Sequence, residues 1–250
     1  MHKICSKQKI MNIAVIFAGG IGTRMNLKVK PKQFLELHGK AIIIHTIELF
    51  DNHPEIDGIV VSCVEDWIDY LKKLLKKFNV KKVVDIVPGG ETGQMSIYNG
   101  LEAAEKHFPV DSVVLIHDGV RPLINKQIIS DNIRQVKKCG SAITTVPTTE
   151  TFVVIDKNYS VIEIPPRSLS KLAKAPQSFI LSEILSVHRQ AQKDNIFNSI
   201  DSCTLMKKYK KPLTLVEGPI ENIKITTPVD YYIFKAIYEA KERGHNDKLL

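Results

Sequence analysis

Short apolar runs alternate with stretches of helical periodicity along the first three fifths of the chain. Runs such as NIAVIF and SVVLIHDG predict buried strands, whereas IIIHTIELFDN spaces its apolar residues as one face of a helix does. This βαβα alternation is typical of a doubly wound, mostly parallel sheet. The sequence therefore predicts an α/β, Rossmann-like fold, whose ligands bind beyond the carboxyl ends of the strands.

The alternation changes character at about Thr148. Residues 148–179 alternate only loosely, contain three prolines and carry a turn signal at Asp156–Asn158. This segment is predicted to be a β-hairpin or β-arm inserted into the domain.

The chain then resumes with two helical stretches, the strands LTLVEG and NIKIT, and a last helix that begins near Pro228. Thr226 or Thr227 could cap that last helix, with the proline at its first position. We expect a single domain over residues 1–250, with a flexible tail at 1–11 and a frayed tail at 244–250.

Composition narrows the class of protein. The chain is 44% hydrophobic and 25% charged, which is ordinary for a globular protein with a substantial core. No segment approaches the run of about 18 to 20 apolar residues that a membrane helix needs, so no membrane association is expected. The four cysteines form no CxxC pair and no zinc-ligand spacing, which predicts reduced thiols in a cytoplasmic protein.

The net charge of +8 raises the possibility of a nucleic-acid partner. Much of this charge lies in two clusters, LKKLLKKFNVKK and MKKYKK. In the first cluster, the apolar residues follow helical spacing and the lysines fall between them, as on the solvated face of an amphipathic helix. We therefore expect no nucleic acid, although a positive surface can speed encounter with anionic small molecules.

The segment FAGGIGTRMNLKVKPKQF follows the first strand and combines glycines with positive charge. It is not a P-loop, and the dinucleotide fingerprint fails because Met25 stands where a third glycine is required. Glycines nevertheless let backbone N–H groups approach an anion closely, and Arg24 and Lys32 supply charge. The alternatives are a phosphate-binding turn and a mobile turn with solvated lysines, and the residues favour the first.

Five ordered motifs then carry a resemblance that covers about residues 12–242. They are AGGIGTRM with PKQFLEL, then GG with SIYNGL, then HDGVRP, then PPR with APQSF, and finally ENIKITTPVD. In this order they resemble the polyol-phosphate cytidylyltransferases, a family with a ribitol-5-phosphate branch and a 2-C-methyl-D-erythritol 4-phosphate branch. The resemblance implies a nucleotidyltransferase sheet with an inserted arm.

The resemblance also implies a reaction, in which CMP passes from CTP to a small polyol phosphate and pyrophosphate is released. The nucleophile would be a phosphate oxygen that is already anionic, so no general base is required. Positive charge and positioning would carry the catalysis. The expected cofactor is Mg²⁺, with CTP as co-substrate.

The resemblance assigns roles residue by residue. It makes Arg24, Lys32 and Lys224 catalytic and Asp118 the metal ligand, because a carboxylate suits Mg²⁺. It places the polyol phosphate at Thr151, Arg167, Asp201 and Lys224. The arginine at 167 would reach a neighbouring subunit through the exchanged arm, which implies a homodimer. The nucleotide would contact Ala18, Gly19, Gly20, Gly22, Gly89, Gly90, Ser96 and Arg121.

Three positions depart from the family pattern. Gly93 stands where an arginine is usual, and Ala175 and Ile200 stand where threonines are usual. The last two remove hydroxyls expected to contact the polyol phosphate, and a hydrogen bond to a charged group is worth about 1.5–3 kcal/mol. These changes leave the identity of the acceptor open more than the reaction type.

The motifs favour the ribitol-5-phosphate branch, with products destined for cell-wall or capsule polymers. The alternative is 2-C-methyl-D-erythritol 4-phosphate and isoprenoid synthesis. Two further alternatives are a related enzyme that uses another nucleotide and a non-catalytic nucleotide- or nucleic-acid-binding protein.

Overall fold

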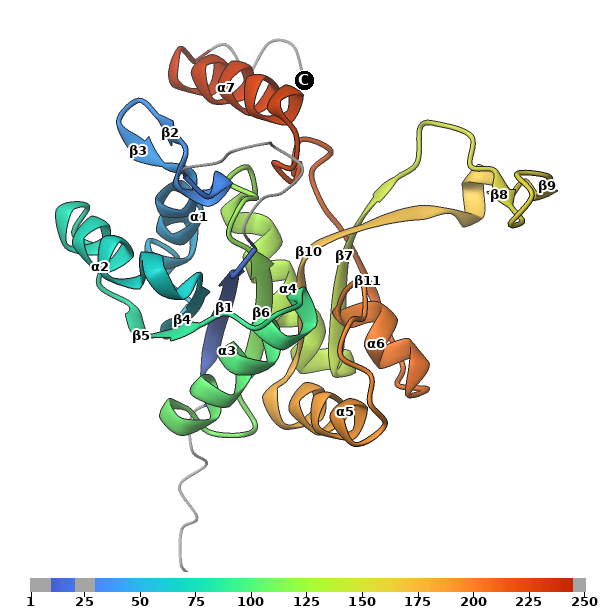
Figure 1. Ribbon diagram of the computed structural model, residues 1–250, viewed down its shortest axis with the longest axis horizontal. Helices are drawn as coiled ribbons and strands as arrows, with labels where there is room; N and C mark the ends of the chain where they lie inside the picture. The colour runs from blue at the N-terminus through green and yellow to red at the C-terminus, as the bar shows by residue number, and fades with distance from the viewer. Residues whose placement is uncertain (1–9, 21–29, 245–250) are drawn as a thin grey trace, which may run out of the picture.

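A seven-stranded sheet runs through the centre of the computed structural model, which describes residues 10–20 and 30–244 (Figure 1). Its strands are β1 (Asn12–Ala18), β4 (Gly58–Cys63), β5 (Val83–Pro88), β6 (Val113–Asp118), β7 (Ser141–Pro147), β10 (Lys171–Ile180) and β11 (Leu215–Glu217). Their spatial order is β11-β7-β10-β6-β1-β4-β5, and every neighbouring pair is parallel except the two made by β10. The predicted α/β fold with a mostly parallel sheet is confirmed.

Helices cover both faces of this sheet. The helices in the described ranges are α1 (Ile42–Asp51), α2 (Ile68–Lys77), α3 (Gly93–His107), α4 (Lys126–Cys139), α5 (Leu181–Lys193), α6 (Ser202–Lys208) and α7 (Pro228–Glu242). Helices α1, α2 and α4 pack on one face, and α3, α5 and α6 pack on the other. The three elements named from the sequence in this region, NIAVIF, SVVLIHDG and IIIHTIELFDN, are present as β1, β6 and α1.

Strand β1 lies between the two hydrophobic layers. Ala14 and Ile16 belong to the core beneath α1, α2 and α4, whereas Ile13 and Val15 belong to the core beneath α3 and α5. All four are fully buried. Successive side chains of a strand point to opposite faces, so a strand covered on both sides must be apolar at every position. The apolar run stops at Ala18, where the glycine turn begins.

Two helix ends carry well-defined cap residues. Helix α4 ends at Cys139, and its C-cap Gly140 has a φ of 80°, a left-handed conformation that favours glycine. Helix α7 is capped by Thr227, one of the two threonines left open by the sequence. Its hydroxyl accepts from the N–H of Asp230, and the carboxylate of Asp230 accepts in return from the N–H of Thr227.

The strand predicted for NIKIT is wrong. The structure places residues 222–226 outside the sheet, in an irregular segment beneath α7. The N–H of Ile225 donates to the carbonyl oxygen of Val120 at 3.0 Å, and the side chain of Ile225 packs in a cluster with Phe234 of α7. Asn222 and Ile225 are fully buried. The segment is buried by packing against a helix, and burial of this kind produces the same apolar spacing as a short strand.

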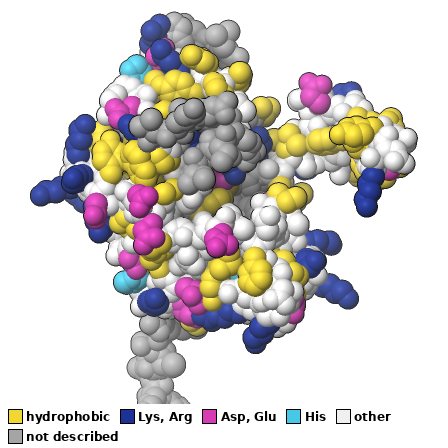
Figure 2. Space-filling view, in the orientation of Figure 1, with side chains coloured by type: hydrophobic (Ala, Val, Ile, Leu, Met, Phe, Trp, Pro, Cys, Tyr) yellow, Lys and Arg dark blue, Asp and Glu magenta, His cyan; other side chains and the backbone are white. Residues whose placement is uncertain are grey.

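An arm projects from the sheet and carries the small hairpin β8 (Val154–Ile155) and β9 (Val161–Glu163) (Figure 1). Its hydrophobic side chains are exposed along much of its length (Figure 2), including Ile162 at 64% and Leu169 at 84%. The arm predicted over 148–179 overlaps the sheet, because Gln177–Phe179 of β10 pair with β6 and β7.

Helix α2 shows where the lysines of the first cluster lie. Leu71, Leu74 and Leu75 are buried in the core, whereas the lysines of this helix are exposed. The charge therefore lies on the solvated face of an amphipathic helix. A second, short hairpin, β2 (Glu36–Leu37) and β3 (Lys40–Ala41), precedes α1.

The chain ends are described only in part. Residues 1–9 and 245–250 of the predicted tails lie outside the described ranges, whereas Met11 accepts a hydrogen bond from the N–H of Val113 at 2.9 Å. No helix in the part of the chain that the structure describes is long and apolar enough to span a bilayer.

Candidate active site

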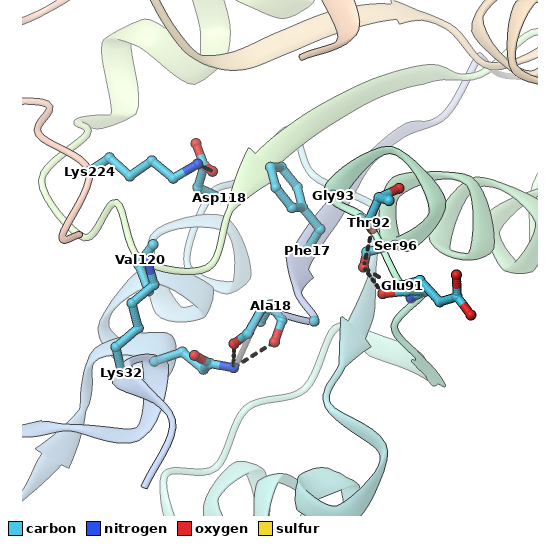
Figure 3. Close-up of a pocket in the computed structure, with 14 residues that line it drawn as sticks. Phe17, Ala18, Lys32, Glu91, Thr92, Gly93, Ser96, Asp118, Val120 and Lys224 are labelled. Carbon is cyan, nitrogen blue, oxygen red and sulfur yellow. Dashed lines mark hydrogen bonds and ion pairs between the residues drawn. The ribbon is translucent and has the colours of Figure 1, made fainter. Parts of the chain in front are cut away.

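A cavity of about 510 Å³ opens beyond the carboxyl ends of β1 and β6. Figure 3 shows Lys32, Asp118 and Lys224 on one side of it, Thr92 and Ser96 on the other, and Phe17 between them. The cavity is lined by Phe17, Ala18, Gly19, Gly20, Lys32, Gln33, Gly90, Glu91, Thr92, Gly93, Ser96, Asp118, Val120 and Lys224. Eight of the predicted site residues therefore line the same cavity.

Glycine at position 19 is required by a close approach of two backbone segments. A Cβ at Gly19 would lie 2.5 Å from Oγ of Ser96 and 3.1 Å from Cα of Gly89. A Cβ at Gly89 would in turn lie 2.7 Å from Cα of Gly19. Gly89 thus lies behind the cavity wall, and its part is to let the turn after β1 pass close to the start of α3.

Ser96 holds the loop that precedes α3. Its hydroxyl accepts from the N–H of Gly90 at 3.0 Å and lies 3.0 Å from the carbonyl oxygen of Thr92. Thr92 is the N-cap of α3, and its hydroxyl accepts from the N–H of Met95. The loop at this side of the cavity is therefore fixed by its own hydrogen bonds.

Gln33 fixes the opposite edge of the glycine turn. Its side chain is 1% exposed, and its amide Nε2 donates to the carbonyl oxygens of Ala18 at 2.6 Å and Gly20 at 3.1 Å. Because a buried amide must be hydrogen-bonded, these contacts fix the start of the turn relative to Lys32. Gln33 lies inside the motif PKQF, but no pattern in the sequence pointed to this contact.

A second cavity, of about 400 Å³, adjoins the first. It is lined by Phe17, Gly93, Ile97, Ile116, Asp118, Arg121, Ala173, Lys174, Ala175, Gln177, Asn198, Ser199, Ile200, Asp201, Ser202 and Lys224. The two cavities share Phe17, Gly93, Asp118 and Lys224. Two ligands, one in each cavity, would therefore meet at the carboxyl end of β6.

Asp118 is the centre of the charged network at this junction. Its Oδ1 lies 2.6 Å from Nζ of Lys224, and its Oδ2 lies 2.7 Å from Nε of Arg121. Burial alone would raise the pKa of this carboxyl, but the two cations outweigh burial and hold the pKa well below its usual range. Asp118 is therefore a carboxylate that positions two cations at the cavity walls.

Arg121 and His117 are hydrogen-bonded near the same end of β6. The guanidinium Nη1 of Arg121 donates to the carbonyl oxygen of Asn222 at 2.9 Å, and the imidazole Nε2 of His117 lies 3.1 Å from the carbonyl oxygen of Arg121. Burial lowers the pKa of His117 to about 4, so it is neutral at physiological pH. His117 lines neither cavity and is structural. Arg121, which was expected at the nucleotide, lines the second cavity only.

Asp201 lines the second cavity and also caps α6. Its Oδ1 accepts from the N–H of Thr204 at 2.8 Å, and its Oδ2 accepts from Nε2 of Gln177 at 3.0 Å. Burial alone would raise its pKa, but hydrogen bonds led by that from Thr204 outweigh burial and lower the pKa. Asp201 is therefore a charged, fixed acceptor at the cavity wall.

Besides Gly89, four predicted residues are not seen at the two cavities, two because they are not described and two because they lie on the arm. Gly22 and Arg24 fall in residues 21–29, which lie outside the described ranges. Thr151 and Arg167 lie on the arm, where Nη2 of Arg167 donates to the hydroxyl of Thr151 at 3.1 Å. Both arm residues are exposed and line neither cavity.

The three departures from the family pattern all lie at the second cavity. Gly93 borders both cavities, and a Cβ there would meet nothing within 4 Å. Ala175 is buried, whereas the side chain of Ile200 is 92% exposed. The three positions at which the resemblance predicts other side chains therefore belong to the wall of the second cavity, and Gly93 also borders the first.

Comparisons with known proteins show the family of this chain. Residues 12–240 match the model of the family IspD: 2-C-methyl-D-erythritol 4-phosphate cytidylyltransferase. The chain belongs to the IspD family. It is therefore a cytidylyltransferase, one of the nucleotidyltransferases, with CTP as its implied co-substrate.

Two relatives and one solved structure illustrate the range of this IspD family. A ribitol-5-phosphate cytidylyltransferase of Vibrio parahaemolyticus is 60% identical over 93% of this chain and 98% of its own length. A 2-C-methyl-D-erythritol 4-phosphate cytidylyltransferase of Clostridium botulinum is 38% identical over 91% and 97% of the two chains. The crystal structure of 4-diphosphocytidyl-2C-methyl-D-erythritol synthase from Anaerococcus prevotii has a TM-score of 0.79 at 26% identity, with 92% and 96% of the chains covered.

The close approach at Gly19 generates a prediction about stability. We expect Gly19→Ala to lower the free energy of unfolding by about 1–3 kcal/mol, because the added methyl group overlaps Ser96 and the backbone of Gly89. The matched control is Gly20→Ala, whose Cβ meets nothing within 4 Å and should change stability by less than about 0.5 kcal/mol. Urea unfolding measures both variants, and equal stability of the two would contradict the packing described here.

Proposed function

We propose that this chain transfers CMP from CTP to ribitol 5-phosphate and releases pyrophosphate. The observation that carries the proposal is the pair of adjoining cavities that share Asp118 and Lys224. A nucleotide in the first cavity and a polyol phosphate in the second would bring the two reacting phosphates together at this junction. The similarity to a ribitol-5-phosphate enzyme at 60% identity supports the choice of acceptor.

In this reaction, an oxygen of the acceptor phosphate attacks the α-phosphorus of CTP. The bond between the α-phosphorus and the oxygen that bridges to the β-phosphorus breaks, and pyrophosphate leaves with that oxygen. The acceptor oxygen is already anionic, so the protein must lower the repulsion between two anions and stabilise the charge of the transition state.

Lys224 and Lys32 are the described cations placed for that task. Lys224 borders both cavities and is held by the carboxylate of Asp118, so its ammonium group is aligned before substrates bind. Lys32 lines the first cavity, beside the glycine turn that would wrap the triphosphate. Arg24 is proposed to add a planar set of donors to the same phosphates.

Asp118 is the residue proposed to hold Mg²⁺. In the described ranges, no cluster of three or more His, Cys, Asp or Glu side chains could hold a metal ion alone. A lone carboxylate still fits Mg²⁺, which takes its other ligands from phosphate oxygens and water. The ion would neutralise triphosphate charge, and Asp118 would share its oxygens between the ion and the two cations that it already holds.

Two finer statements complete the proposal. We place the enzyme in the cytoplasm, and the free thiols of Cys63, Cys139 and Cys203 are in keeping with a reducing compartment. Its product would serve as an activated polyol for cell-wall or capsule polymers. The second candidate acceptor, 2-C-methyl-D-erythritol 4-phosphate, is favoured by the description of the family model and would serve isoprenoid synthesis.

Pyrophosphate release with different acceptors tests the proposed function. We expect turnover with CTP, Mg²⁺ and ribitol 5-phosphate, and less with 2-C-methyl-D-erythritol 4-phosphate or with ATP, GTP or UTP in place of CTP.

Lys32→Ala should lower kcat because it removes charge at the triphosphate. Lys30→Ala is the matched control, since Lys30 pairs with Glu36 at the surface. Failure of every acceptor would reject the reaction, and preference for the methylerythritol substrate would reject the proposed acceptor.

The arm is proposed to complete the second cavity of a partner subunit in a homodimer. Arg167 and Thr151 are exposed and hydrogen-bonded to each other, and the arm around them carries exposed hydrophobic side chains. Exposed apolar surface of this extent is typical of an interaction site. Exchange of arms would bring the guanidinium of Arg167 to the acceptor phosphate of the neighbouring site.

Complementation between two inactive variants tests this exchange. We expect Arg167→Ala and Lys32→Ala to be weakly active alone, because each removes a cation from every site. A heterodimer isolated through two different tags should regain activity, since one of its two sites would then combine an intact Lys32 with an intact Arg167 from the partner. No recovery in the isolated heterodimer, or a monomer in light scattering, would contradict arm exchange.

A further inference from the structure

Lys174 is a cation on the wall of the second cavity to which no sequence motif pointed. It lies in β10 where the pairing with β7 is interrupted between Ala173 and Gln177. Its side chain is half-buried and lines the cavity together with Arg121 and Lys224. The break in the ladder thus places an ammonium group beside the proposed acceptor.

Lys174 differs from the other two cations of this wall in having no counter-ion among the described residues. Arg121 and Lys224 both pair with Asp118, whereas no carboxylate in the described ranges forms an ion pair with Lys174. Burial and then the charge of Arg121 lower the pKa of Lys174. A half-buried ammonium group without an anion is unfavourable, and an anion bound in the cavity would relieve that cost.

The charges of the cavity point to the kind of anion. Three cationic side chains, Arg121, Lys174 and Lys224, face two carboxylates, Asp118 and Asp201. The wall of the second cavity therefore carries an excess of positive charge. That balance suits a phosphate ester rather than a neutral polyol.

We propose that Lys174 binds the phosphate group of the acceptor and is a specificity-determining residue of the second cavity. The proposal rests on the proposed function and deepens it. Lys174 directly precedes Ala175, one of the positions where a family hydroxyl is absent. Its ammonium group offers three donors and a full charge, which would replace the hydrogen bonds lost at Ala175 and Ile200.

The split of kinetic constants in Lys174→Gln tests this role. We expect the KM for ribitol 5-phosphate to rise about tenfold or more, because a hydrogen bond to a charged group is lost. The KM for CTP should stay within about twofold, and the melting temperature should not fall, since the substitution removes a half-buried, unpaired charge. An unchanged KM for the acceptor would overturn the proposal, as would an equal rise in both KM values.

Two further variants serve as controls. Lys174→Arg keeps the charge and should retain most of the acceptor affinity. Lys171→Gln removes a lysine from the same strand, but this lysine is exposed and pairs with Glu217 at 3.5 Å, so its KM values should match the wild type. A loss in Lys171→Gln as large as that in Lys174→Gln would show a general charge effect and overturn the specific role.

The outcome for Lys174 can be separated from that for the proposed function. Both candidate acceptors carry a phosphate group, so the comparison is made with whichever one the wild-type enzyme turns over. If neither is used, the proposed function fails. Calorimetric titration with inorganic phosphate in the presence of CMP then decides for Lys174: weaker binding by Lys174→Gln than by the wild type supports the site, and equal or absent binding overturns it.

Discussion

The buried carboxylate of Asp118 is the interaction on which the active site depends. It lies at the end of an apolar strand and holds Lys224 on one oxygen and Arg121 on the other. Arg121 in turn binds the carbonyl oxygen of Asn222, so the irregular segment beneath α7 is tied to the sheet. Removing one partner of such a buried ion pair would leave an uncompensated buried charge. The three charged side chains therefore depend on one another. Folding therefore aligns the cations before any phosphate arrives.

This arrangement explains how one sheet serves two anionic substrates. At the first cavity, glycines let two backbone segments pass close to each other, as the overlap at Gly19 shows. The second cavity instead presents side chains, among them Asp201, which caps a helix, and Lys174, which forms no ion pair with the carboxylates that the structure describes. Such a division would allow the wall proposed for the acceptor to vary while the wall proposed for the nucleotide is kept. Ala175 and Ile200, which depart from the expected pattern, both line the cavity proposed for the acceptor.

The sequence predicted the parallel strands, most helices, and the meeting of Lys32, Ser96 and Asp118, because periodicity and ordered motifs are local signals. It could not predict that β10 lies antiparallel inside the sheet, since that pairing joins residues far apart in the chain. The contacts of Gln33 and the position of Lys174 at the second cavity were missed for a related reason. Both arise only after folding, and no spacing in the sequence encodes either one.

We propose that the two cavities hold the two halves of one product across Lys224. A crystal structure of the enzyme with CDP-ribitol would show whether they do. We expect the cytidine against Gly19 and Ser96, the ribitol chain beside Asp201, and the diphosphate within hydrogen-bond distance of Nζ of Lys224. A product bound wholly in one cavity, or a diphosphate that does not contact Lys224, would contradict this placement.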